Sequence, residues 1–540
     1  MDLKEELDQF FELAGTCDDH RDLNGCSDKF LIYFLSLSIK FDKPIVFDHL
    51  GELLKERDVA MNTLPFRSHP FFAAAKEGRV DYAEKLLELG TEFHIVDEKN
   101  RTPLHYAAGG GHFGMIIWLI EQGSDIYAMD DLGCNILHHL GLCKTGDRKT
   151  ITQIAAYLLT YDLPFDMPDQ AHQMTPLGFA LINGWTDFAK LLIDKGADLD
   201  RIDSEGFTYL HSAAFYGREE LCDFFLEKEI PIDMPNNALE TPLFLALNRG
   251  HVAVANKLLK RGANTTTVNI NGRTTLHAAL VGEQEEIAHL LIEQGADIHA
   301  KDSEGQTALI HAAYSGLEDF AFFLIKQGAD IHVSTTEQVT LLHIASGCTM
   351  YNDVPTPSLD QLAYFLIEKE LDMHAETTKG ATPFHAAIHR NNLSLVTHYL
   401  KKGADPKRKT KTLETPLHIA AAEGHRVLCQ LLIKAGAPID EKNSRGCTPL
   451  LYASANKHPE IVLDLLEYNV ELNDFPKEEG SPLFDAAGNG WLEVTQKLLE
   501  KGADASHTTL YDKTAYDLAK HYGHEEVAEL LLSHTNERSF

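Results

Sequence analysis

Histidine and cysteine are the residues of this chain best suited to chemistry, with 28 histidines and 8 cysteines among 540 residues. Both residue types are ligands for transition metals. The densest group is the adjacent pair His138 and His139, followed by Cys143. His138 also belongs to a repeated pattern, and the residues that remain are too few to hold a metal. We therefore expect no metal site and no cofactor.

A second group with possible chemistry lies near the N-terminus, where Cys17, His20 and Cys26 could act as nucleophile and base. Only their proximity in the sequence supports this role. The chain has no glycine-rich phosphate loop, no Gly-x-Ser-x-Gly elbow, no His-Glu-x-x-His and no Cys-x-x-Cys. We expect a protein that is not an enzyme, and a site in the first 60 residues or in an inserted loop stays the alternative.

The charge of the chain argues against nucleic acid and anionic membranes as partners. It carries 48 basic and 81 acidic residues, a net charge of −33, whereas both partners require phosphate neutralisation by Lys and Arg. One cluster is basic: Lys401, Lys402, Lys407, Arg408, Lys409 and Lys411. It is interpreted either as a solvated loop or as a dock for an acidic or phosphorylated segment.

The sequence also indicates a cytoplasmic, monomeric protein. Its acidic start, Met1 to Glu6, does not resemble a secretory signal, and no run reaches the 18 apolar residues of a membrane span. The cysteines are scattered without paired spacing, which favours reduced thiols.

Many of the histidines recur with a period of 33 residues, and this period indicates the elements that position them. Thr-Pro-Leu-His, then one residue, then Ala-Ala stands intact at 102–108 and at 415–421. The Thr position of this pattern recurs about fourteen times, with two enlarged steps of 40 and 42 residues, at His69, Thr102, Asn135, Thr175, Thr208, Thr241, Thr274, Thr307, Thr340, Thr382, Thr415, Thr448, Ser481 and Thr514.

Each repeat predicts two short helices. Thr is a helix N-cap and Pro suits the first helical position, while a glycine about nine residues later, such as Gly111, ends the first helix with a positive φ. A Leu-Leu pair such as Leu431-Leu432 marks the second helix. Polar turns ending in glycine, such as 203–206, separate the repeats and predict hairpin turns.

This pattern resembles the ankyrin repeat family over roughly 470 of the 540 residues. The resemblance implies an all-α solenoid of about 14 repeats, each a helix-turn-helix with a β-hairpin finger, preceded by a degenerate helical cap. It also implies that the signature histidines bond to the capping Thr region within and between repeats, at His105, His138, His211, His277, His343, His385 and His418.

The repeats divide the chain into three segments. Residues 1–62 form a helical N-terminal segment in which Leu53-Leu54 falls in phase with the repeats and predicts a degenerate capping repeat. Residues 63–533 carry the tandem repeats, and residues 534–540 form a C-terminal tail. Insertions near 142–150 and 348–360 lie in the turn between two helices, and we expect them at the edge opposite the fingers, either as a second binding surface or as tolerated additions.

By the same resemblance, the first helix and the fingers line a concave groove. Its variable positions are four, seven and eight residues after the Thr, and they predict a binding set of Tyr106, Phe179, Phe215, Tyr216, Arg249, Tyr314, Arg390 and Tyr452. Phe179, Phe215, Tyr216 and Tyr314 are the expected anchors, since aromatic residues dominate binding energy. For Phe179 and Phe215, packing against neighbouring repeats is an equal alternative.

The function that these features favour is a non-catalytic scaffold or adaptor that binds one or more proteins through its groove and fingers. An alternative is a bacterial effector delivered into a host cell, for which the tail Ser533 to Phe540 would be tested by deletion. By resemblance, His299 and His332 occupy finger positions that can be hydroxylated in the family.

Overall fold

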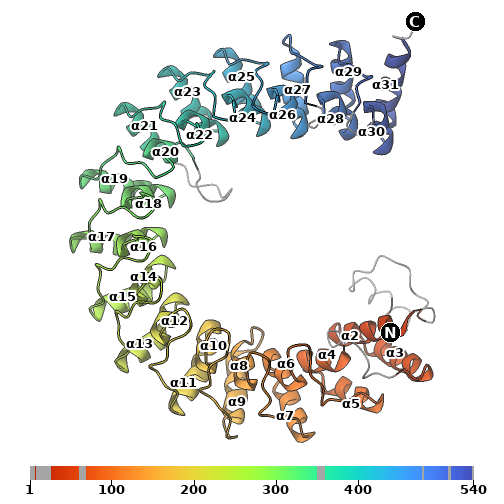
Figure 1. The fold of residues 1–540 in the computed structure, drawn as a ribbon, viewed down its shortest axis with the longest axis vertical. Helices are drawn as coiled ribbons and strands as arrows, with labels where there is room; N and C mark the ends of the chain where they lie inside the picture. The colour runs from red at the N-terminus through yellow and green to blue at the C-terminus, as the bar shows by residue number, and fades with distance from the viewer. Residues whose placement is uncertain are drawn as a thin grey trace. The chain divides into compact units, whose positions relative to one another are not determined.

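The computed structural model describes Leu7, Leu23 and residues 26–59, 69–348, 359–476, 480–508 and 513–537. These residues form helices joined by turns, with isolated bridge residues such as Ser334, which pairs with Thr340, so the predicted all-α class is confirmed. The chain divides into two compact halves, Met1–Ile270 and Asn271–Phe540 (Figure 1).

The N-terminal half contains a leading helix pair and six repeats. The leading pair is α2 (Asp28–Lys40) and α3 (Pro44–Glu56). The first helices of the repeats are α4 (Pro70–Glu77), α6 (Pro103–Gly110), α8 (Ile136–Gly141), α10 (Pro176–Asn183), α12 (Tyr209–Phe215) and α14 (Pro242–Asn248). The second helices are α5 (Val80–Glu88), α7 (Phe113–Glu121), α9 (Arg148–Leu158), α11 (Thr186–Asp194), α13 (Glu219–Glu227) and α15 (Val252–Lys260).

The C-terminal half contains eight repeats of the same kind. The first helices are α16 (Thr275–Val281), α18 (Ala308–Tyr314), α20 (Leu341–Ala345), α22 (Pro383–His389), α24 (Pro416–Ala422), α26 (Pro449–Ala455), α28 (Pro482–Asn489) and α30 (Ala515–His521). The second helices are α17 (Glu285–Glu293), α19 (Glu318–Lys326), α21 (Asp360–Glu368), α23 (Leu393–Lys401), α25 (Arg426–Lys434), α27 (Pro459–Leu466), α29 (Leu492–Glu500) and α31 (Glu525–Glu537).

An N-cap residue precedes each first helix, and the signature histidine completes the cap. In the Thr208 repeat, the Thr208 N–H donates to His211 Nδ1 at 3.1 Å, and His211 Nε2 donates to the Glu240 carbonyl oxygen of the next finger at 3.2 Å. All seven signature histidines accept this backbone N–H at Nδ1, which confirms the predicted bond within the repeat. The predicted bond between repeats is present for five of them, whereas Nε2 of His105 and of His277 is buried without a hydrogen-bond partner among the described residues. A neutral imidazole suits this position, because one nitrogen accepts and the other donates.

A second set of histidines, which the sequence pattern did not single out, joins neighbouring repeats. Each lies just before the second helix of its repeat. It donates from Nε2 to a carbonyl oxygen near the end of the first helix of the preceding repeat, as His251 does to Phe215 at 3.0 Å. Gly217 makes room for this ring: its φ is +65°, and an added Cβ would lie 2.6 Å from the imidazole. The other members are His112, His425, His458 and His524.

The fingers are tight turns, and from residue 97 to residue 447 a backbone hydrogen bond connects the tip of each to the next. Asp131 N donates to Lys99 O at 3.0 Å, and Lys411 N donates to Lys379 O at 3.0 Å. These bonds add to the stacked apolar core, in which side chains such as Phe188, Phe225 and Phe320 are fully buried. Stability in such a stack is the sum of weak repeats and strong interfaces.

The leading pair packs on the first repeat through α2 and α4. Leu31, Ile32, Phe34 and Leu35 of α2 are fully buried, and so are most apolar residues of α3, including Leu54. This burial is what a capping repeat requires, and the assignment of this segment stays a prediction. No helix within the described ranges has the length and apolar character needed to cross a membrane.

Candidate functional site

The first helices of each half form an inner row and the second helices an outer row (Figure 1). Each predicted groove position is therefore on an inner helix or, for Tyr216, Arg249 and Arg390, directly after one. The geometry separates these positions into residues that hold the fingers, residues that are buried, and residues that are accessible.

Tyr106 holds a finger. Its hydroxyl donates to Asp97 Oδ2 at 2.9 Å and accepts from Arg101 at 2.8 Å, while the guanidinium of Arg101 lies 4.8 Å from the ring centroid. Burial, followed by the hydrogen bond to Asp97, raises the pKa of Tyr106 to about 12. Tyr452 is held in the same way, by hydrogen bonds from Asn443 and Arg445 and to Glu414.

Histidines take this role in two other repeats. His139 Nε2 lies 3.0 Å from Asp130 Oδ2, and His311 Nε2 lies 3.2 Å from Asp302 Oδ2. Burial opposes ionisation of both aspartates, but hydrogen bonds from the histidine and from backbone N–H groups outweigh it. The pKa of Asp130 is held at about 2, and that of Asp302 is also lowered.

The sequence interpretation missed the finger residue five positions before the Thr. Its side chain accepts two backbone N–H groups of the turn, as Asn236 Oδ1 does from Ala238 and Glu240 at 2.9 and 2.8 Å. The signal was present in the sequence as Asp or Asn at this fixed offset, at Asp97, Asp130, Asp203, Asn236, Asp302 and Asn443. These residues shape the groove wall without facing a partner.

Three other predicted residues are partly or wholly covered. Phe179 is 8% exposed and contacts the His138 ring at a centroid distance of 5.9 Å, so the packing alternative holds for this residue and it is not an accessible anchor. Tyr314 is half-buried at the end of α18. Arg390 is half-buried over Gly347, where any added Cβ would collide with it.

The remaining predicted residues form an aromatic and cationic cluster at the C-terminal ends of α12 and α14, which we call the Phe215 cluster: Phe215, Tyr216 and Arg249. The Arg249 guanidinium lies 4.0 Å from the Phe215 ring centroid, and the Phe215 and Tyr216 rings are 4.9 Å apart. Phe215 and Tyr216 are half-buried, as Tyr314 and Arg390 are, and Arg249 is exposed. Burial raises the pKa of Tyr216, whereas the charges of Arg249 and Arg218 oppose the shift.

Three of the six residues in the predicted basic cluster pair with carboxylates of the preceding and following repeats. Lys402 pairs with Glu368 at 2.9 Å, Lys409 pairs with Glu441 at 2.7 Å, and Arg408 pairs with Glu376. The role of the basic cluster as a dock stays a prediction.

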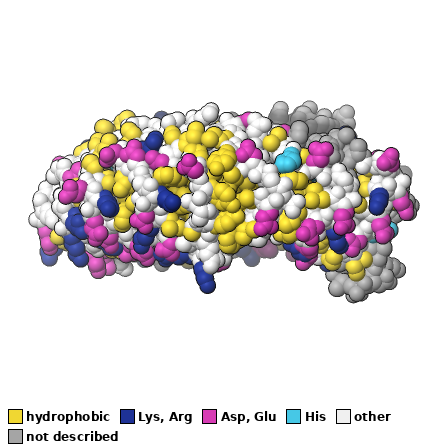
Figure 2. All heavy atoms as spheres, turned by 90° about the horizontal axis from the view of Figure 1, so that it is seen from below, with side chains coloured by type: hydrophobic (Ala, Val, Ile, Leu, Met, Phe, Trp, Pro, Cys, Tyr) yellow, Lys and Arg dark blue, Asp and Glu magenta, His cyan; other side chains and the backbone are white. Residues whose placement is uncertain are grey.

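Figure 2, seen from below Figure 1, shows acidic and basic side chains interspersed with apolar ones on the face it presents.

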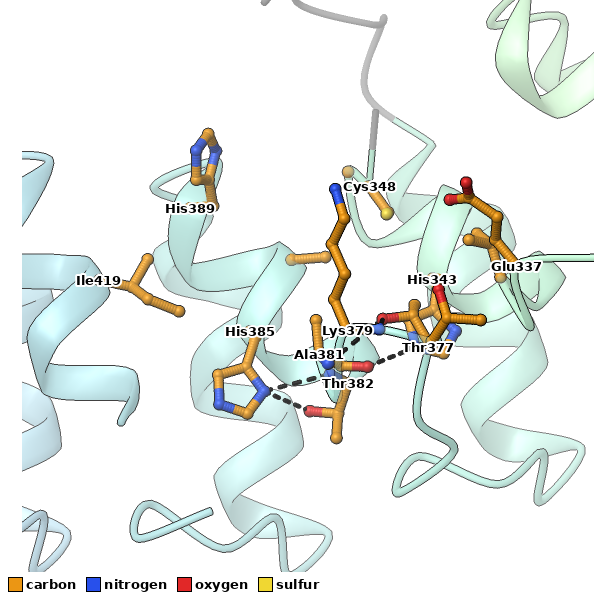
Figure 3. A pocket seen from close by; sticks show the side chains of 14 residues that line it. Glu337, His343, Cys348, Thr377, Lys379, Ala381, Thr382, His385, His389 and Ile419 are labelled. Carbon is orange, nitrogen blue, oxygen red and sulfur yellow. Dashed lines mark hydrogen bonds between the residues drawn. The ribbon is translucent and has the colours of Figure 1, made fainter. Parts of the chain in front are cut away.

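A cavity of about 330 Å³ opens in the C-terminal half beside the shortened helix α20 (Figure 3). Val339 and Ile419 contribute apolar walls, Lys379 extends from a finger toward Cys348, and Glu337 lies nearby. Burial raises the pKa of Cys348 to about 11, so its thiol is protonated at neutral pH. The cavity therefore provides a recess of mixed polarity and no activated nucleophile.

The residues considered for chemistry are engaged in structure where they are described. His138 Nδ1 contacts Asn135 and its Nε2 donates to Met167 O at 2.9 Å, while His139 is bound to Asp130. Within the described ranges, no group of three His, Cys, Asp or Glu side chains could hold a metal ion. Cys17 and His20 lie outside the described residues, as do residues 349–358 of the second insertion and the tail from 538.

One groove position carries a destabilising charge. Asp485 accepts a hydrogen bond from Ser454 Oγ at 2.7 Å, and its burial raises the carboxyl pKa to about 6. Because the folded pKa exceeds the unfolded value, the fold loses stability as the pH rises from about 4 to about 6, and the full cost is present above pH 6. We expect Asp485→Asn to stabilise the protein by about 1 kcal/mol at pH 7.5 and to be neutral near pH 4. Thermal unfolding of both proteins at the two pH values measures this, and an unchanged midpoint at pH 7.5 would contradict it.

The fold is a helical repeat solenoid with a groove. It is defined by stacked helix pairs, capped first helices and hydrogen-bonded finger turns. Two family models described as ankyrin repeats match the chain, one at residues 71–120 and the other at 144–237, 232–302, 286–356, 309–410, 356–443 and 384–476. The chain belongs to the ankyrin repeat family. Ankyrin repeats imply a protein-interaction role.

Curated relatives match parts of the chain. It is 29% identical over 192 residues to the transient receptor potential cation channel subfamily A member 1 homolog of Caenorhabditis elegans, covering 35% of this chain and 15% of that protein. The human channel subunit is 26% identical over 205 residues, 37% of this chain and 18% of its own length. Phosphocholine transferase AnkX of Legionella pneumophila is 25% identical over 252 residues, 43% of this chain and 25% of that protein. The chain thus spans at most a quarter of these relatives.

Proposed function

We propose that this chain is a non-catalytic scaffold that binds another protein along the inner face of its N-terminal half. The Phe215 cluster carries the proposal. It presents two aromatic rings and a guanidinium stacked within 4.0 Å of one of them, on an inner surface where other groove positions are occupied by finger contacts. Aromatic and Arg side chains supply most of the binding energy at protein interfaces, because they bury large areas at low entropic cost.

Replacement of the cluster tests this role. We expect Phe215→Ala with Tyr216→Ala to weaken partner binding by roughly 30-fold, because truncating central aromatic anchors costs about 2 kcal/mol or more. Affinity purification with mass spectrometry on wild type and variant identifies candidate partners, and titration of a purified partner gives the affinity.

A matched control replaces exposed aromatic residues outside the inner row of helices. Tyr127 is 51% exposed and Tyr468 is 41% exposed, so Tyr127→Ala with Tyr468→Ala removes comparable ring area. We expect this control to retain full binding. If the Phe215 and Tyr216 variant keeps wild-type affinity while its circular dichroism is unchanged, the proposed surface is wrong.

A second candidate is the same binding role in a host cell after delivery by a bacterium. The match to a Legionella pneumophila protein over 43% of this chain favours it. A translocation reporter fused to the chain, with and without the tail Ser533 to Phe540, tests delivery. Equal translocation of both fusions would exclude the tail as the export signal, and no translocation of either would reject the candidate.

A further inference from the structure

A cavity on the inner face of the N-terminal half has a different chemistry from the Phe215 cluster. This cavity, of about 510 Å³, is formed by three successive repeats and is lined by Lys76, Tyr106, Gly109, Gly110, His139 and Lys144, among others. Gly109 and Gly110 stand seven and eight residues after Thr102, the positions that Phe215 and Tyr216 occupy relative to Thr208. At Gly109 the cavity is open because α6 has no side chain there, whereas the backbone of Gly110 packs directly against Lys76 and His112.

Cations surround this cavity in a strongly acidic chain. Lys76 and Lys144 are both exposed, and neither forms an ion pair within 4.0 Å with another described residue. Arg101 is a third cation of the lining, but its guanidinium is bound to Asp97 at 2.6 Å. Glu77 is the one acidic side chain among the lining residues. The chain as a whole carries a net charge of −33, whereas three cations and one carboxylate line this cavity.

The first insertion supplies one of the two lysines. Leu142, Lys144 and Thr145 line the cavity, so the insertion, which the sequence placed at the edge opposite the fingers, reaches the groove as well. It is anchored there: Trp185 Nε1 donates to Cys143 O at 3.0 Å, and Thr145 Oγ1 donates to Gly110 O at 3.4 Å. Two hydrogen bonds therefore fix the segment that carries Lys144.

We propose that this cavity binds the carboxylate side chains of an acidic segment in a partner protein, an inference that rests on the proposed scaffold function. Lys76 lies in the last turn of α4 and Lys144 follows α8, with α6 between them, so the two charges suit separate carboxylates of one segment. A phosphate dianion is best held by a free guanidinium fork, whereas Arg101 is already engaged by Asp97 and Tyr106. The Tyr106 ring and the glycine backbone provide the wall for the stem of the segment.

Gly109 offers a way to close the cavity without disturbing the fold. A Cβ added there would approach only the His139 carbonyl oxygen, at 3.9 Å, and the residue lies in a helix where glycine is unfavourable. Gly109→Leu therefore fills the hollow. By contrast, a Cβ at Gly110 would lie 2.5 Å from Lys76 O, so that position is unsuitable for a test.

Fluorescence anisotropy of labelled peptides with the full chain tests the proposal. The probes are hexaglutamate, hexaglutamine and a phosphoserine peptide of equal net charge, each at about 50 and 300 mM NaCl. We expect hexaglutamate to bind wild type in a salt-dependent manner and hexaglutamine not to bind. Lys76→Glu with Lys144→Glu, and separately Gly109→Leu, should weaken hexaglutamate binding by roughly tenfold or more.

The control is Lys195→Glu with Lys260→Glu, which makes the same change of net charge at two exposed residues near the ends of outer helices. It should stay within about twofold of wild type, because charges beyond the Debye length are screened. The Phe215 and Tyr216 variant should also bind hexaglutamate normally, so failure here is distinct from failure of the scaffold test. Equal hexaglutamate binding by wild type and the Lys76 and Lys144 variant, absence of binding, or binding of the phosphoserine peptide alone would each overturn the proposal.

Discussion

Between pH 6.5 and pH 4 we expect the protein to lose most of its stability, because its capping histidines must be neutral to fold. Burial lowers the pKa of His105, His138 and His211 to about 4 and that of His277 to about 3. His69, His343 and His385 are lowered to about 4 as well, and His418 is shifted in the same direction.

The sign follows from the protons bound in each state. The unfolded chain takes up a proton at each histidine below about pH 6.5, whereas the folded chain does not until about pH 4, so stability is present above 6.5 and is lost as pH falls. Each histidine then costs about 2 kcal/mol at pH 5, and several together amount to on the order of 10 kcal/mol, comparable with the stability of a whole domain.

Denaturant unfolding followed by circular dichroism from pH 7.5 to 4.5 measures this loss. The slope of the unfolding free energy against pH gives the number of protons taken up, which should approach the number of buried histidines. Replacing exposed His299 and His332 with Gln should leave the slope unchanged, and His211→Gln should lower it by about one proton. An uptake below about two protons near pH 5 would show that the caps tolerate charge.

The second large effect is expected at Asp302, whose replacement by Ala should destabilise the surrounding repeats by about 3 kcal/mol. Asp302 Oδ1 accepts the N–H groups of Glu304 and Gln306, each at 2.9 Å, and its Oδ2 contacts His311 and Arg273. Removing the carboxylate leaves these buried donors unsatisfied, which costs more than the bonds themselves contribute.

Asp302→Asn is the matched variant, since Asn236 and Asn443 already hold equivalent turns through the same two backbone N–H groups. We expect it to cost only about 1 kcal/mol. Hydrogen exchange of α16 to α19 measures the effect locally, which matters because long repeat arrays need not unfold in two states. Equal protection in wild type and Asp302→Ala would show that the fingers are held by stacking alone.

These predictions connect the capping network to the groove. Tyr106 and Tyr452 were predicted to face a partner, and the structure uses their hydroxyls to hold fingers, as it uses His139 and His311 in two other repeats. The Phe215 cluster and the cavity over Gly109 are the two inner surfaces of the N-terminal half that we propose for binding. One is aromatic and the other cationic, so a single partner segment could contact both kinds of surface only with matching apolar and acidic residues.

The sequence by itself determined the repeats, their helices and the role of the signature histidines. These features depend on short-range signals, namely a Thr cap, a Pro at the first turn and a glycine at the end, and each signal recurs at a fixed period. A local signal repeated many times is readable without a structure, because each copy confirms the register of the others.

Only the tertiary structure decided which groove residues are accessible. Phe179 and Phe215 are both aromatic groove positions, yet Phe179 is buried against His138 of the preceding repeat and Phe215 is only half-buried beneath Arg249. In the same way, Arg408 and Lys409 are neutralised by carboxylates 32 residues away, whereas Lys144 has no partner within the described part of the chain. Accessibility and charge balance depend on side chains of neighbouring repeats, which meet only when the solenoid is stacked.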